Sequence, residues 1–278
     1  MRKKKRRLKK KFALFLAVFL ILIGFCFWGV KYFSSSSRDW HEVQPDQGQG
    51  KEKADNAVVN KLDPAPKNSL EYLTLSDGEY LTDKGYTLVI QDGVASIDGQ
   101  VIANKTYSLP QNYQPTDPYQ AVRGERCNDC IDKTAMKQFQ LMQSDAQALG
   151  LNIYIASGYR SYQYQVNLYD RYVSTSGKAG ADTYSSRPGY SEHQTGLCFD
   201  LNSIEDSFAN TNEGRWVNEN AYRYGFVIRF PKGQEKYTGY QYESWHLRYV
   251  GEALAKQLYH DGEYLSLEEY YGITSSYE

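Results

Sequence analysis

Two short segments of the sequence hold the side chains that could do chemistry. The first runs from Ser191 to Asp200 (Ser-Glu-His-Gln-Thr-Gly-Leu-Cys-Phe-Asp), and the second is Glu243-Ser-Trp-His246. The chain has only 4 histidines, and His193 and His246 fall in these segments. Two imidazoles and one carboxylate are ligands of the kind that catalytic zinc takes, while its fourth position stays open to water and a nearby Glu handles that water's protons. The pattern therefore predicts metal-dependent hydrolysis.

The spacing of these residues sets conditions on the backbone. His193 and Asp200 are separated by Gly196, where a turn would let both side chains converge on one point. His246 would complete a set of three ligands. Glu243 lies three residues before His246, and on a regular strand that spacing places the two side chains on opposite faces. A turn or a bulge is therefore needed if Glu243 is to act on a water molecule at the same metal.

The amino-terminal segment differs in charge and hydropathy from the rest of the chain. Residues 1–11 form a basic tail, and residues 12–30 form an uncharged, apolar run of about the length that crosses a bilayer. The positive-inside rule then predicts a cytoplasmic tail, a single transmembrane anchor and an extracellular remainder. A cleaved signal peptide is the alternative. The remainder is acidic, because residues 1–31 hold no Asp or Glu, and this argues against nucleic acid as a partner.

Composition divides the chain after the predicted anchor into three parts. Residues 31–67 are rich in Ser, Asp, Gln, Gly, Lys and Pro, which predicts a flexible linker. Residues 68–106 contain short alternating runs broken by Asp-Gly turn signals, which predict a small β-rich region packed on the next domain. Residues 107–278 form the main domain, and no internal repeat is visible in them.

The main domain shows helical and strand patterns in mixed order. An apolar stripe of Ala135, Phe139, Met142, Ala146 and Leu149 predicts a helix that starts at Asp132 and ends at Gly150. The further predicted segments are a strand at 151–156, a turn at 157–160, a helix capped by Ser161 through about 175, a loop at 177–189, a helix at 215–224, strands at 226–230 and 242–250, and helices at 252–259 and 266–271. Mixed order indicates an α+β fold with helices packed on an antiparallel sheet.

The cysteines outside the apolar run are Cys127, Cys130 and Cys198. A disulfide between Cys127 and Cys130 is favoured in an oxidising compartment. A zinc pair and a thioredoxin-type redox site are the alternatives. Cys198 lies two residues before Asp200, and we expect it to be a small buried filler rather than a ligand.

The two chemical segments and several blocks around them resemble a known family. Ser-x-His-x6-Asp followed by Glu-x-Trp-His is similar to the motif of the VanY-type zinc D-alanyl-D-alanine carboxypeptidases, which include the LdcB/DacB cell-wall L,D-carboxypeptidases. The resemblance covers roughly residues 107–260 and includes Ser157 to Ser161, Gln165, Arg187 to Gly196 and His246 to Gly251. One departure is Cys198, which stands where the family usually has Ala.

The resemblance implies a fold, a cofactor and a set of roles. The fold would be α+β with a central antiparallel sheet, of the D-Ala-D-Ala carboxypeptidase and hedgehog-like type, and the chain would hold one Zn2+. The implied zinc ligands are His193, Asp200 and His246, the catalytic base is Glu243, the cation that stabilises the oxyanion is Arg160, and the substrate contacts are Gln165 and Ser191. The alternatives are that Ser191 is a plain turn residue and Gln165 an exposed helix residue.

The implied activity is removal of the carboxy-terminal D-Ala from peptidoglycan stem peptides at the bacterial surface. Cleavage of tetrapeptides (L,D) is favoured over cleavage of pentapeptides (D,D), by resemblance alone. A cross-link endopeptidase and a non-catalytic wall-binding module are the alternatives. Loss of Glu243 or of a ligand would mark the binding module, and none is lost.

Overall fold

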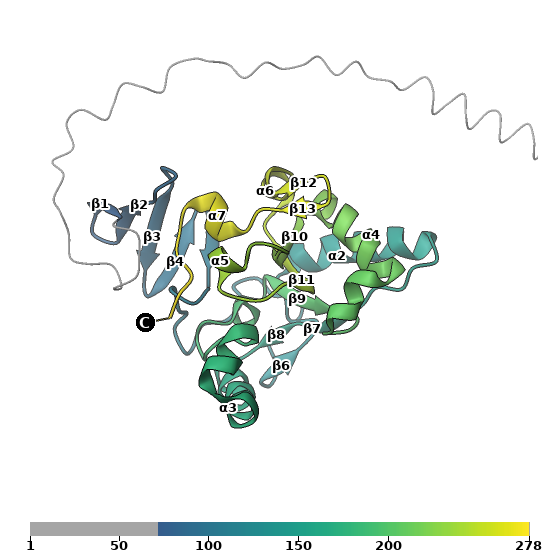
Figure 1. Cartoon of the computed structure of the whole chain (residues 1–278), viewed down its shortest axis with the longest axis horizontal. Coiled ribbons are helices and arrows are strands. Elements are labelled where there is room, and N and C mark those ends of the chain that lie inside the picture. The colour runs from purple at the N-terminus through teal and green to yellow at the C-terminus, as the bar shows by residue number, and fades with distance from the viewer. Residues whose placement is uncertain (1–71, 278) are drawn as a thin grey trace, which may run out of the picture. The chain divides into compact units, whose positions relative to one another are not determined.

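The computed structural model describes residues 72–277. The predicted basic tail (1–11), membrane anchor (12–30) and linker (31–67) lie outside the described residues. Within 72–277, no helix combines the length and the hydropathy needed to cross a bilayer. The described residues have a mixed α/β architecture with antiparallel sheets, shown in Figure 1.

The central sheet has four strands in the order β10-β11-β9-β7, and every neighbouring pair is antiparallel. Their bounds are Phe226–Phe230 for β10, Glu243–Tyr249 for β11, Cys198–Leu201 for β9 and Ile155–Ser157 for β7. Side chains alternate between the two faces of such a sheet. One face carries Phe199, Leu247 and Ile228, while the other carries Asp200 and His246. The first face belongs to the hydrophobic core, and the second builds the candidate site.

Helix α2 (Lys133–Ala148) covers the apolar face of the sheet. Asp132 caps it by accepting hydrogen bonds from Thr134 N and Ala135 N, as a short side-chain acceptor at this position should. Four members of the predicted stripe are buried, and the ring of Phe139 packs 5.1 Å from that of Phe199. The predicted fifth member, Leu149, is 65% exposed, because the backbone already leaves the helix there.

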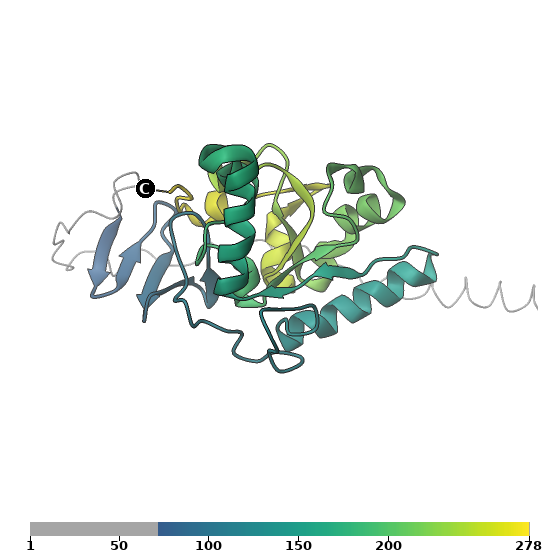
Figure 2. The same ribbon diagram turned by 90° about the horizontal axis from the view of Figure 1, so that it is seen from below.

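Helix α3 (Tyr162–Tyr184) lies on a different side of the central strands from α2, as Figures 1 and 2 show. Ser161 caps it by accepting from Tyr164 N. The predicted loop at 177–189 is wrong over residues 178–184, which are helical. Gly177 has a left-handed φ of 71° and interrupts the helix, but the chain resumes helical geometry directly after it.

The predicted strand at 151–156 is also wrong in its first half. Only Ile155–Ser157 pairs with β9. In the segment before it, the backbone N–H groups of Asn152 and Tyr154 donate to the side chains of Glu213 and Asn202 instead. The predicted turn at 157–160 contains a short strand, β8 (Tyr159–Arg160), which pairs with β6 (Arg126–Cys127).

The predicted helices at 215–224, 252–259 and 266–271 and the predicted strands at 226–230 and 242–250 agree with the structure to within a few residues, while η1, η2, α5, β12 and β13 were not predicted. Helix α4 and the 3-10 turn η3 end at Gly225, which has a left-handed φ of 81°. The bounds are η1 Glu192–Thr195, η2 Asp206–Asn210, α4 Asn212–Asn220, η3 Ala221–Tyr224, α5 Glu235–Thr238, α6 Glu252–Leu258, β12 Tyr259–His260, β13 Glu263–Tyr264 and α7 Leu267–Tyr271.

The small β-rich region is a five-stranded antiparallel meander, β1-β2-β3-β4-β5. Its strands are Leu73–Ser76, Glu79–Leu81, Thr87–Gln91, Val94–Ile97 and Gln100–Ile102. Leu88, Ile97 and Ile102 belong to the same core cluster as Leu247. In Figure 1 the end of the chain (yellow) runs beside these strands, and Tyr72 Oη donates to Gly272 O while accepting from Thr274 N. The meander therefore packs on the main domain.

Candidate metal centre

The turn that carries His193 is set by a glycine. Residues 192–195 form η1, and Gly196 ends it with a left-handed φ of 70°. A Cβ at Gly196 would lie 2.6 Å from Pro115 Cγ, so a side chain is excluded by space as well as by conformation. Strand β9 begins two residues later. This tight reversal brings His193 Nε2 to 3.4 Å from Asp200 Oδ2, as the sequence spacing predicted.

His246 reaches the same point from the neighbouring strand. It pairs directly with Asp200 across β9 and β11, so both side chains stand on one face of the sheet. His246 Nδ1 lies 3.4 Å from Asp200 Oδ1. Glu243 joins them because β11 is irregular: Ile228 pairs with Leu247 while Phe230 pairs with Glu243. A two-residue step along β10 thus matches a four-residue step along β11, and Glu243 Oε2 lies 3.3 Å from His246 Nδ1.

The donor set fits a zinc ion. In a tetrahedron with bonds of about 2.1 Å, neighbouring donor atoms are roughly 3.4 Å apart. His193 Nε2 lies at this distance from Asp200 Oδ2, and His246 Nδ1 lies at the same distance from the other oxygen, Oδ1. These separations exceed the usual length of an N–H···O hydrogen bond. His193 Nδ1 lies 2.7 Å from Gly158 O, and since a carbonyl can only accept, Nδ1 carries the proton and Nε2 presents its lone pair. The three side chains are buried and line one pocket, so the protein fixes their positions while the pocket leaves access to the site.

Charge shifts the pKa values within this cluster. Burial alone would raise the pKa of Asp200, but His193 and Arg160 outweigh burial and hold it well below its usual range. Burial would lower the pKa of His246, yet Cys198, Glu243 and Asp200 raise it well above the ordinary value. The pKa of His193 is raised as well, chiefly by Cys198 and Asp200 against burial and Arg160. Burial raises the pKa of Glu243 above that of an exposed Glu. Protons therefore compete with a metal for both imidazoles.

Cys198 lies beside both imidazoles. It is fully buried, as expected of a filler, but it stands on the same face of β9 as Asp200, and its Sγ lies within 4.8 Å of the ring nitrogens of His193 and His246. Burial raises the pKa of the thiol, and the two imidazoles outweigh it and bring the pKa to about 7. The even spacing between residues 198 and 200 was the one sequence signal for this orientation.

Arg160 borders the ligand cluster at the end of β8. Its Nη2 donates to Asp200 Oδ2, and both Nε and Nη2 donate to Ser157 Oγ. Ser157 in turn pairs with Asp200 across β7 and β9. The guanidinium is therefore held in one orientation next to the ligand carboxylate, with only 15% of its side chain exposed.

Gln165 and Ser191 complete the predicted set. Gln165 lies on the first turns of α3, where it is buried and donates from Nε2 to Ser186 O at 2.7 Å. Its Oε1 is buried without a hydrogen-bond partner among residues 72–277. Ser191 is buried directly before η1 and makes no side-chain cap bond there. All seven predicted residues line one pocket, with Tyr164, Tyr190 and Tyr240 also in its wall.

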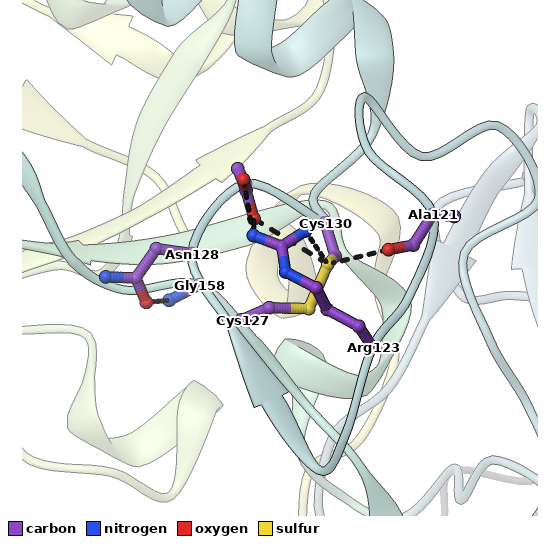
Figure 3. Close-up of a disulfide and its surroundings, with 7 residues drawn as sticks. Ala121, Arg123, Cys127, Asn128, Cys130 and Gly158 are labelled. Carbon is purple, nitrogen blue, oxygen red and sulfur yellow. Dashed lines mark hydrogen bonds and ion pairs between the residues drawn. A yellow bond between two sulfur atoms is a disulfide. The ribbon is translucent and has the colours of Figure 1, made fainter.

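A chain of two hydrogen bonds connects the His193 ring to the loop closed by a disulfide. Cys127 and Cys130 are bonded, and Figure 3 shows Asn128, between them, directed at Gly158. Asn128 Oδ1 accepts from Gly158 N at 3.1 Å, and Gly158 O is the acceptor of the His193 ring N–H. A Cβ at Gly158 would lie 2.8 Å from Asn128 Cα, so only glycine allows this approach. Sequence reasoning predicted the disulfide but not its connection to a ligand.

Glu192 is a residue that sequence reasoning missed. It is 3% exposed, and its Oε1 accepts from Arg229 Nε at 2.7 Å and from Arg248 Nη1 at 3.0 Å. Its Oε2 faces His246 Nε2 at 3.9 Å. Burial raises the pKa of Glu192, but the two arginines outweigh it and keep the pKa below its usual range. Arginines inside the apolar runs 226–230 and 245–250 were the available signal for a buried anion.

Comparison with known proteins identifies the family. The profile described as VanY, D-alanyl-D-alanine carboxypeptidase, matches residues 128–252. The putative carboxypeptidase YodJ of Bacillus subtilis is 39% identical over 198 residues, which are 65% of this chain and 71% of YodJ. The chain belongs to the VanY carboxypeptidase family. The residues matched to the VanY profile include every predicted ligand as well as Glu243 and Arg160.

Solved structures of VanY-family proteins have the same fold. DacB from Streptococcus pneumoniae superposes with a TM-score of 0.55 at 39% identity, covering 68% of this chain and 97% of DacB, and a second structure of DacB describes it as an L,D-carboxypeptidase. A VanY D,D-pentapeptidase from a VanB-type resistance cassette, solved in complex with Zn(II), superposes with a TM-score of 0.51 at 36% identity, covering 61% and 96%. The predicted α+β fold is confirmed at the level of a mixed fold with antiparallel sheets.

Proposed function

We propose that this chain is a zinc-dependent carboxypeptidase that removes the carboxy-terminal D-Ala from peptidoglycan stem peptides. The observation that carries the proposal is that a nitrogen of His193 and a nitrogen of His246 each lie 3.4 Å from an oxygen of Asp200, with the Glu243 carboxylate beside His246. Relatives named D-alanyl-D-alanine carboxypeptidase in Enterococcus faecium and L,D-carboxypeptidase in Streptococcus pneumoniae support the substrate class.

The roles of the residues follow from their positions. Zinc held by the three ligands would supply a Lewis acid that polarises the scissile carbonyl and activates water. Glu243 takes a proton from the attacking water and passes it to the leaving amine of D-Ala. Its raised pKa suits this task, because a base with a pKa closer to the working pH both accepts and returns a proton readily.

Arg160 stabilises negative charge that develops on the carbonyl oxygen. Its bonds to Ser157 and Asp200 fix the guanidinium before the substrate arrives, so no reorganisation is needed during the reaction. A preorganised cation in a partly buried wall acts more strongly than one in water. Gln165 and Ser191 line the same pocket and contact the stem peptide there.

Tetrapeptide substrates (L,D cleavage) are favoured over pentapeptides (D,D cleavage). The support is the likeness to DacB, which is 39% identical over 68% of this chain, against 36% over 61% for the VanY pentapeptidase. The cellular setting is proposed from the basic tail and the apolar run at residues 1–30: a single-pass membrane anchor with the catalytic domain outside. A disulfide between Cys127 and Cys130 suits that oxidising side.

The test is hydrolysis by the full-length chain in detergent, loaded with zinc. Purified muropeptide tetrapeptides, pentapeptides and cross-linked dimers are incubated separately, and products are followed by mass spectrometry. We expect release of D-Ala from the tetrapeptide. Glu243→Gln, which keeps the shape of the side chain and removes the base, should bind zinc and lower kcat by roughly 10²–10⁴-fold.

Each other result assigns a different function. Release from the pentapeptide alone would make the protein a D,D-carboxypeptidase. Cleavage of the cross-linked dimer without release of terminal D-Ala would make it an endopeptidase. Binding of muropeptides without any cleavage, with zinc present, would make it a wall-binding module and overturn the proposal.

A further inference from the structure

Two buried polar atoms face each other behind the ligand cluster. They are Nε2 of His246 and Oε2 of Glu192, which are 3.9 Å apart. Neither atom has a hydrogen-bond partner among the described residues. Their side chains are only 6% and 2% exposed. Burying a donor or an acceptor without a hydrogen-bond partner costs free energy. Two such atoms opposite each other therefore indicate that the pair has a function.

The function is indicated by the other ring nitrogen of His246, which faces the proposed metal position. Nδ1 is the atom near Asp200 and Glu243, at 3.4 and 3.3 Å, and it is the atom that a metal at this point would engage. A neutral imidazole that binds through Nδ1 carries its proton on Nε2. That proton points to the side of the ring where Glu192 Oε2 lies. A carboxylate behind a ligating imidazole fixes its tautomer and raises its basicity.

Glu192 is itself held in the required orientation. Its hydrogen bonds from Arg229 and Arg248 both end on Oε1, so the second oxygen is directed to His246. Arg229 is anchored in turn by two parallel bonds to Glu268, at 2.7 and 2.8 Å. Such a bidentate pair sets the position of the guanidinium as well as its charge. The carboxylate of Glu192 therefore has little freedom to turn away.

The same buried network reaches the meander. Arg248 Nη2 donates to Val101 O in β5 at 2.8 Å. Asn104, two residues after the end of β5, donates from Nδ2 to Glu268 Oε1 at 3.0 Å. The meander thus closes over the charged groups and keeps them from water, which strengthens their mutual interactions. This contact gives the small β-rich region a connection to the metal centre.

We propose that Glu192 is a positioning residue that closes from 3.9 Å to hydrogen-bond distance of the His246 Nε2–H when Nδ1 binds metal, and so sets that imidazole for metal binding. The buried pairs Arg229–Glu268 and Arg248–Val101 hold Glu192 in place from behind. The proposal rests on the zinc site proposed above. It differs from that proposal in concerning the tautomer and affinity of one ligand rather than the reaction.

The first test needs no substitution. Full-length chain labelled with ¹⁵N only in histidine is loaded with Zn2+, and long-range ¹H–¹⁵N spectra are recorded for its 4 rings. We expect His193 to carry its proton on Nδ1 and His246 to carry its proton on Nε2, with the His246 proton shifted to low field by the carboxylate. A zinc-loaded His246 with its proton on Nδ1 would overturn the proposal.

The second test compares Glu192→Gln with the matched control Glu268→Gln. Each change removes one buried negative charge that pairs with Arg229, but only Glu192 faces His246. We expect the Kd for Zn2+, measured by chelator competition, to rise by about 10- to 100-fold in Glu192→Gln. In Glu268→Gln it should rise much less, and the low-field His246 signal should persist there.

The outcomes separate the two proposals. Equal losses of zinc affinity in the two variants would show that Glu192 acts only as part of a buried charge network, and would overturn the inference. If Glu192→Gln does not fold, the tautomer of His246 in the unaltered chain still decides. Failure of the unaltered chain to bind Zn2+ would instead count against the proposed function, and muropeptide hydrolysis would be measured independently.

Discussion

The two imidazoles of the metal centre are supported by opposite kinds of chemistry. His193 donates to a neutral backbone carbonyl, Gly158 O. Gly158 N in turn donates to the Asn128 side chain, and Asn128 lies between the two cysteines of the disulfide. His246 faces a carboxylate that two buried arginines share. One support is neutral and lies partly at the surface, since Asn128 is exposed. The other is charged and fully enclosed.

This difference predicts which perturbations each side tolerates. Neutral hydrogen bonds near solvent lose little when one is broken, because water replaces the partner. A buried ion network fails more severely, because removing one member leaves its partners charged and unpaired. The metal centre should therefore tolerate substitutions on the His193 side and be vulnerable to single changes of charge on the His246 side.

The largest expected difference in stability comes from removing one central side chain from each support, Arg229 behind His246 and Asn128 behind His193. Arg229→Met leaves Glu192 and Glu268 without their shared cation, and we expect the free energy of unfolding to fall by about 3–5 kcal/mol. Asn128→Ala should lower it by about 1 kcal/mol. Urea denaturation with a chelator present measures both. Similar losses in the two variants would mean that the charged side is not the more fragile one.

An intermediate effect is expected from opening the disulfide. The paired change Cys127→Ser and Cys130→Ser removes a bond across a sequence separation of only 3 residues, so the stability lost should be about 2 kcal/mol. In the zinc-loaded chain the ring signals of His193 should change while those of His246 stay in place. Equal changes in both rings would show that the two supports are not independent.

The smallest effect concerns pH in the metal-free chain. The pKa values of His193 and His246 are raised on folding, so their contribution to stability is fully present below about pH 6.5, the unfolded value, and is lost as pH rises through the folded pKa. The melting temperature should therefore fall above pH 6.5. More of this loss should belong to His246, because its pKa is raised well above the ordinary value.

Zinc should reverse this dependence, because it binds only the neutral imidazoles. The stabilisation that zinc produces should grow between about pH 6 and pH 8, when melting curves with zinc and with chelator are compared. A metal-free chain that becomes more stable over this range would contradict the raised pKa values. In that case the comparison would hold for the hydrogen-bond partners of the two imidazoles, but the charged groups around His246 would not raise its pKa above that of His193.

The reactive centre could be predicted because its residues belong to two short segments with distinctive types. His193, Gly196 and Asp200 lie close together in the sequence, and the glycine between them accounts for the reversal. The need for an irregular β11 also followed from the spacing of Glu243 and His246, and the shifted register supplies it. Local patterns also predicted the helices α2 and α7 and the meander.

What could not be predicted depends on partners distant in the sequence. Glu192, Arg229 and Arg248 come from three different segments, and nothing local shows that they meet. Residues 177–189 were predicted to be a loop, whereas a second helical stretch follows the interruption at Gly177, and no local pattern signals that resumption. The thiol of Cys198 faces two imidazoles, and one of them comes from a strand that lies far along the chain.

The order of strands in the central sheet has a consequence for biogenesis. β11 is the last of the four strands in the sequence, yet it lies between β10 and β9, and it brings both His246 and Glu243. The sheet cannot close until translation has passed residue 249, and until then a nascent chain offers only His193 and Asp200 of the three proposed ligands. Two donors hold zinc weakly, so high-affinity metal capture becomes the final event of maturation. We therefore expect the chain to acquire its metal after synthesis is complete.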